Sequence, residues 1–277
     1  KISIAAISDG ENNVSGSGIA DNATGLSTLK TLVGGSPSTD TAIDSLYGRV
    51  TGTVSLTDDP ITVDNAIPIS TFTVGSSGSI TYSITDTASG AGSNGLATAS
   101  SAVNTAIANA AAVEATGTMT VNEAVEMLGG VSDGVAASKF TYSISDTFDE
   151  VTTAIGSADG SAKKIAHTRA AQVTLTPTTV ANLIGDVSDL ISGNHTYTVK
   201  DELDNLISTT NQTNLESLLS KATSIVVVDS SANAVTLNVD DAAIRTKLGT
   251  LVSRADDSGT ARPITATITG EKANING

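Results

Sequence analysis

One eight-residue pattern occurs three times in this chain and constrains its fold more than any other feature. It reads ITYSITDT at residues 80–87, FTYSISDT at 140–147 and HTYTVKDE at 195–202. Tyr82, Tyr142 and Tyr197 hold the same position in the three copies, and the chain has only four tyrosines. A repeat of this kind predicts similar units that each bury one face against a neighbouring unit.

Each copy alternates apolar and polar residues. In the first copy, Tyr82 and Ile84 fall on one face of an extended chain, while Thr81 and Ser83 fall on the other. This period of two predicts a strand with one buried face and one polar face.

Further strand-like and helical segments separate the copies. Strand-like segments lie at residues 118–121, 172–175, 225–228, 234–237 and 264–269. Apolar residues at helical spacing follow at 180–191 and 244–252. Alternation of strands and helices predicts parallel strands joined by helical crossovers.

We therefore expect an α/β fold whose strand-helix units form an elongated, partly parallel sheet or a solenoid-like stack. The expected units cover about residues 80–139, 140–194 and 195–270 of a repeat region at 76–277.

Residues 1–75 are expected to form a separate, more β-rich unit, either immunoglobulin-like or a diverged repeat. Strand-like segments lie at 50–56 and 68–74, and helices are expected around 25–33 and 39–47. The glycine- and serine-rich run at 75–79 is the predicted boundary.

The charge balance limits the partners of the chain. It carries 29 acidic and 14 basic residues, a net charge of -15, so phosphate groups of nucleic acids and of anionic membranes would repel it. The sequence has no cysteine, which excludes disulfides, and no apolar run long enough to predict membrane insertion. Cations such as calcium are the favoured ligands of such a chain.

Asp86, Asp146 and Asp201 close the three copies of the repeated pattern. A carboxylate between a strand and a helix is compatible with catalysis or calcium binding. Because aspartate is a preferred helix N-cap, we expect each of these residues to cap the helix that follows it.

The chain has two histidines, His167 and His195. His195 stands where the other copies carry Ile80 and Phe140, on the inward side of its strand, and no partner for it is visible in the sequence. His167 falls on the basic face of a predicted helix. We expect neither histidine to be catalytic, because a triad needs a nucleophile and an orienting acid that the sequence does not identify.

Neighbouring carboxylates offer the hard oxygen ligands that calcium prefers. The expected calcium ligands are Asp58, Asp59, Asp240 and Asp241. None of them lies in an EF-hand loop or a glycine-rich calcium nonapeptide.

The Tyr-Ser-Ile-Ser-Asp-Thr segments resemble the repeats of large secreted bacterial cell-surface proteins of the S-layer-like and adhesin-like kind. The resemblance covers about residues 80–270. It implies an extracellular scaffold or adhesin, and such proteins often depend on calcium.

We therefore expect a self-assembling structural module of a bacterial surface layer, filament or adhesin stalk, without catalysis and with calcium as its one cofactor. Its expected partners are copies of itself and surface polysaccharide. The alternatives are a glycan-binding adhesion module, a component of a phage fibre, and a polysaccharide lyase built on a solenoid.

Overall fold

A computed structural model of the chain describes residues 7–9, 53–56, 60–70, 79–129, 139–184, 194–257 and 260–270. Contacts divide the chain into two compact units, Lys1–Tyr142 and Ser143–Gly277.

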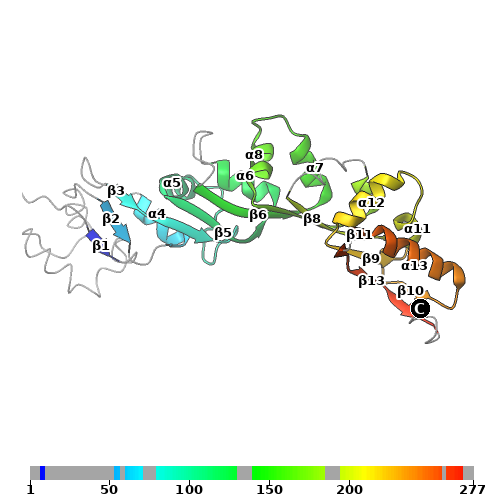
Figure 1. Ribbon diagram of the computed structural model, residues 1–277. Helices are drawn as coiled ribbons and strands as arrows, with labels where there is room; N and C mark the ends of the chain where they lie inside the picture. Colours follow the sequence, from blue (N-terminus) through cyan, green and yellow to red (C-terminus); the bar gives the residue numbers. More distant parts are fainter. Residues whose placement is uncertain are drawn as a thin grey trace, which may run out of the picture. The chain divides into compact units, whose positions relative to one another are not determined.

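The largest element is a seven-stranded sheet in which every described pairing is parallel. Its strand order is β13-β9-β8-β7-β6-β5-β4, so that β4 to β9 follow one another across the sheet in the order of the chain. Figure 1 labels β5, β6, β8, β9 and β13 of this sheet. The strands are β4 (Ser83–Asp86), β5 (Ala112–Met119), β6 (Phe140–Asp146), β7 (Gln172–Thr178), β8 (His195–Glu202), β9 (Ser224–Val228) and β13 (Ile264–Thr265). The predicted α/β class with parallel strands is confirmed.

Helices fill the connections between successive strands of this sheet. They are α5 (Ser101–Asn109), α6 (Val121–Gly129), α7 (Phe148–Gly156), α8 (Ala162–Arg169), α9 (Val180–Leu183), α11 (Leu203–Leu206), α12 (Gln212–Lys221) and α13 (Ala242–Arg254). A parallel pair requires such a crossover, because the chain must return to the same end of the sheet before the next strand begins.

The remaining elements are short. They are β1 (Ile7–Asp9), β2 (Thr53–Leu56) and β3 (Ser79–Thr81), which form a parallel sheet, then α4 (Val63–Ser70), and the pairs β10 (Thr236–Asn238) with β14 (Thr267–Thr269) and β11 (Asp256–Asp257) with β12 (Thr260–Ala261).

The prediction of a strand at 68–74 is wrong at its start, because residues up to Ser70 belong to α4. Pro68 did not prevent the helix, although proline usually ends one. The helices expected at 25–33 and 39–47 lie outside the described residues, as does nearly all of the predicted boundary at 75–79.

Burial alternates along the strands as predicted. In β8, Tyr197, Val199 and Asp201 are buried, whereas Thr196 and Thr198 are partly exposed. The polar face carries hydroxyl pairs between neighbouring strands, with 2.9 Å between the Oγ1 atoms of Thr174 and Thr196. The second such pair joins Thr198 and Ser224, also at 2.9 Å.

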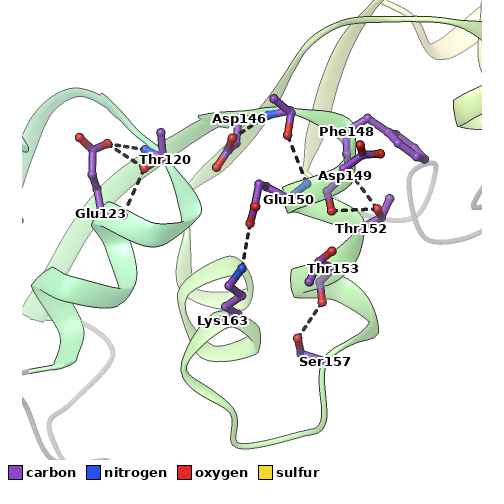
Figure 2. Close-up of polar contacts among 11 residues, drawn as sticks. Thr120, Glu123, Asp146, Phe148, Asp149, Glu150, Thr152, Thr153, Ser157 and Lys163 are labelled. Atoms are coloured by element: carbon purple, nitrogen blue, oxygen red, sulfur yellow. Dashed lines mark hydrogen bonds and ion pairs between the residues drawn. The ribbon is translucent and has the colours of Figure 1, made fainter.

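Several helices begin at a serine or threonine whose hydroxyl accepts from the first turn. The clearest example precedes α6, where Glu123 Oε2 accepts from Thr120 N at 2.7 Å and Thr120 Oγ1 accepts from Glu123 N at 3.2 Å (Figure 2). This reciprocal arrangement is a capping box, and it satisfies two amides that the helix itself leaves without partners.

Candidate functional site

The most conspicuous polar groups in the core are the aspartates at the ends of β4, β6 and β8. Asp86, Asp146 and Asp201 are only 5%, 8% and 6% exposed. Buried carboxylates are costly unless they are hydrogen-bonded, so their partners decide what they do.

Asp86 and Asp201 make the same two backbone contacts. One oxygen accepts from the amide of the next residue, which is Thr87 N at 2.8 Å for Asp86 and Glu202 N at 2.8 Å for Asp201. The other oxygen accepts from the first amide of the preceding helix, Val63 N of α4 at 3.0 Å and Val180 N of α9 at 2.8 Å. Each carboxylate therefore ties the end of its strand to the helix before it.

This finding corrects the prediction that each aspartate caps the helix that follows. The N-cap of α7 is Thr147, whose hydroxyl accepts from Glu150 N at 3.3 Å, and the N-cap of α11 is Glu202, with no side-chain bond. The aspartate side chain points inward from the strand, so it reaches the N-terminus of the helix that already covers the sheet. A negative charge at that N-terminus is also favoured by the helix dipole.

Asp146 lies at the end of β6, beside the start of α7 (Figure 2). Its Oδ1 accepts from Thr147 N at 2.7 Å, as in the other two copies. A short distance away, Glu150 of α7 forms an ion pair of 2.8 Å with Lys163 of α8, which joins the two helices of this crossover.

The repeated tyrosines are buried with their hydroxyl groups satisfied. Tyr82, Tyr142 and Tyr197 are each 1% exposed. Tyr82 donates to Ala106 O of α5 at 2.8 Å, and Tyr197 donates to Leu218 O of α12 at 2.9 Å. Burial raises the pKa of both phenols, that of Tyr197 to about 12, so both stay protonated donors at neutral pH. Tyr82 and Tyr197 therefore join a strand to a helix, and none of the three tyrosines offers an exposed ring for stacking against a sugar.

The two histidines meet, although the sequence showed no partner for either. His167 Nε2 in the last turn of α8 lies 2.9 Å from His195 Nε2 at the first residue of β8. Both rings are partly buried, and their centroids are 5.1 Å apart. The sequence alone did not indicate this contact of His195. The two residues are 28 positions apart, and only the order of the strands brings them together.

The environment of His167 predicts an acid-sensitive fold. Desolvation, His195 and Lys164 together lower the pKa of His167 from 6.5 to about 4. Between these two pH values the unfolded chain therefore binds more protons than the folded chain. The contribution of His167 to the free energy of unfolding is fully present above pH 6.5 and is lost as the pH falls through 4. We expect the free energy of unfolding to drop less over this range in His167→Gln than in the natural chain. Urea denaturation at several pH values, with EDTA present, measures this difference. An equal fall of the free energy of unfolding with pH in the two proteins would contradict the prediction.

The expected calcium ligands do not gather into a site in the part of the chain that the structure describes. No group of three histidine, cysteine, aspartate or glutamate residues there is placed to hold a metal ion. Asp241 is the N-cap of α13, accepting from Ala243 N at 2.7 Å. Its neighbour Asp240 donates its amide to Asn238 Oδ1 at 3.0 Å. Asp58 and Asp59 lie outside the described residues.

The capping role of Asp241 yields a prediction of moderate size. Asp241→Ala should lower the free energy of unfolding by about 1 kcal/mol, because one amide of α13 loses its acceptor. Asp241→Asn keeps an acceptor oxygen and should lower the free energy of unfolding by less than Asp241→Ala does. Urea denaturation with calcium and with EDTA separates capping from metal binding, since a calcium ligand would change the result only when calcium is present.

Two further polar clusters were not identified from the sequence. Asp64 in the first turn of α4 accepts from Asn94 Nδ2 at 2.6 Å and from Ser93 N at 2.7 Å, and these bonds, that to Asn94 first, lower its pKa. Arg254, 7% exposed, donates to Ser208 O at 2.9 Å beyond the end of α11. No sequence motif marks either residue. Both form hydrogen bonds with backbone atoms or neighbouring side chains of the fold.

The candidate residues thus hold the elements of the fold together. The chain matches no known family, and no curated protein or solved structure is similar to it at a significant level. In the described residues, no helix has the length and apolar character that crossing a membrane requires.

Proposed function

We propose that this chain is a non-catalytic structural module that assembles with copies of itself in an extracellular bacterial surface layer, filament or adhesin stalk. The observation that carries the proposal is the use of the buried Asp86 and Asp201 to tie each strand to the helix before it. The same device in the first and third copies of the repeated pattern supports a chain built by adding one strand-helix unit to the next, as in solenoid proteins.

The repeated tyrosines support the same role. Tyr82 and Tyr197 each donate to a helix carbonyl from a fully buried position, and this bond fixes the distance between strand and helix in their two units. Aspartate, tyrosine and threonine are residue types that often occur in active sites. Here they make hydrogen bonds that hold strands and helices together. A glycan-binding module would instead use exposed aromatic rings, and Tyr82, Tyr142 and Tyr197 are buried.

Strand β13 offers a way for copies to join. It is the last strand of the seven-stranded sheet, and it pairs with β9 through Ile264 opposite Ile225. Ile225 N donates to Pro263 O at 2.9 Å, so by the parallel pattern Ile264 N–H faces away from β9. An edge strand with outward amides is a template for pairing with a strand of another chain.

Sedimentation velocity over a range of concentrations tests the proposal. We expect the natural chain to form larger species as its concentration rises. Ile264→Pro removes the outward amide without removing an internal bond, so it should weaken association at least about tenfold. Ile264→Val keeps the amide and should associate like the natural chain, and circular dichroism checks that both variants fold. A natural chain that stays monomeric at every concentration would overturn assembly.

A further inference from the structure

We propose that His167 and His195 together bind one divalent transition-metal ion of the zinc class, with water in the remaining positions. The site lies within the unit Ser143–Gly277, between the last turn of α8 and the first residue of β8. It is independent of the assembly proposed above and uses none of the expected calcium ligands.

The separation of the two ring nitrogens suits a shared ion. Two nitrogens bound to one metal at roughly 2.0–2.1 Å lie about 2.9 Å apart for a right angle at the metal and about 3.4 Å apart for a tetrahedral angle. The observed Nε2–Nε2 distance is 2.9 Å. The ligand atoms therefore need to separate by no more than about half an ångström to accept an ion of either geometry.

The arrangement of the rings shows what the metal would replace. Their centroids are 5.1 Å apart, much farther than the nitrogens, and their planes differ by 22°, so the edges carrying Nε2 face each other. Two neutral imidazoles in this position share one proton, which one Nε2 donates to the other. An ion takes the place of that proton once the rings have turned so that both Nε2 lone pairs meet it, and the displaced proton moves through solvent to Nδ1 of the same ring, which therefore stays neutral.

The surroundings of the pair favour neutral rings, which is the state that binds metal. His167 lies on a helix that also carries Lys163, Lys164 and Arg169. Lys163 is paired with Glu150 at 2.8 Å, whereas Lys164 opposes positive charge at His167. Lys164 therefore disfavours the protonation of His167, and its positive charge also weakens the attraction of the site for a metal ion. The site should therefore bind less tightly than one with three protein ligands.

The donor chemistry distinguishes this site from a calcium site. Imidazole nitrogen is a good ligand for zinc, nickel and copper, whereas calcium takes oxygen ligands. Among the described residues no third histidine, cysteine, aspartate or glutamate joins the pair, so water completes the coordination.

The full chain, prepared without a polyhistidine tag and stripped of metal with EDTA, is titrated with zinc chloride by calorimetry near neutral pH. Because the chain has only two histidines, its imidazole NMR spectrum contains the signals of these two rings alone. We expect one zinc ion per chain and a shift of both ring signals. Calcium chloride is the matched control, and it should leave both signals in place.

Two variants make the test decisive. His195→Phe introduces the residue that occupies the equivalent place in β6, Phe140, which is buried there, so this variant should fold. His167→Gln keeps a polar side chain on α8. Each should lower zinc affinity at least about tenfold, because one of two ligands is lost. The proposal is overturned if zinc does not bind, if it binds without shifting the ring signals, or if both folded variants bind zinc as tightly as the natural chain.

Discussion

Tyr197→Ala is expected to lower the free energy of unfolding by about 4 kcal/mol, more than any other substitution that we propose for this chain. The ring is 1% exposed and lies between β8 and α12, where its hydroxyl donates to Leu218 O at 2.9 Å. Alanine would leave a cavity in a packed core and would also remove the bond that joins strand to helix. The loss should appear in urea denaturation as a lower midpoint with little change in slope.

Tyr197→Phe separates the two parts of this effect. It keeps the ring and removes only the hydroxyl, so we expect a loss of about 1 kcal/mol. Leu218 O would still accept from Ala222 N at 3.0 Å, which limits the cost. A loss below about 2 kcal/mol for Tyr197→Ala would show that this ring is not a principal core contact.

Asp201→Ala is expected to lower the free energy of unfolding by about 3 kcal/mol. Its carboxylate is buried and accepts from Val180 N, Glu202 N and Asn205 Nδ2, each within 2.8 Å. Alanine would leave these donors without their acceptor, two of them backbone amides at the starts of α9 and α11. Amide hydrogen exchange at Val180 should accelerate in the variant, because its N–H loses the bond to β8.

Two controls accompany this substitution. Asp201→Asn keeps one acceptor oxygen and should lose less than the alanine variant. Asp159→Ala removes a carboxylate of the same kind from an exposed turn, and we expect a change within about 0.5 kcal/mol. Equal losses of the free energy of unfolding in Asp201→Ala and Asp159→Ala would contradict the proposal that Asp201 links strand to helix through its hydrogen bonds.

The parallel sheet could be predicted because its cause is local. Alternation in the segments that hold Tyr82, Tyr142 and Tyr197 fixes which strand face is buried, and helical spacing between the strands requires crossovers. The apolar spacing at 244–252 likewise predicted α13, which spans Ala242–Arg254. In both cases the pattern of residues within one short segment is enough to predict the strand or the helix.

The partners of the polar residues could not be predicted, because they depend on how units stack. A capping aspartate has the same appearance in sequence whether it serves the next helix or the previous one. Asp201 serves the previous helix because its side chain faces the helix layer, where Val180 N lies within reach. His167 and His195 come together for a similar reason, since the chain completes β7 and α9 before it returns beside α8.

Electron microscopy of the purified chain in calcium, before and after addition of EDTA, tests the central proposal most directly. We expect ordered filaments or sheets in both conditions, because the proposed assembly rests on the edge strand β13. Discrete single particles at every concentration, unchanged by EDTA, would contradict a self-assembling surface module.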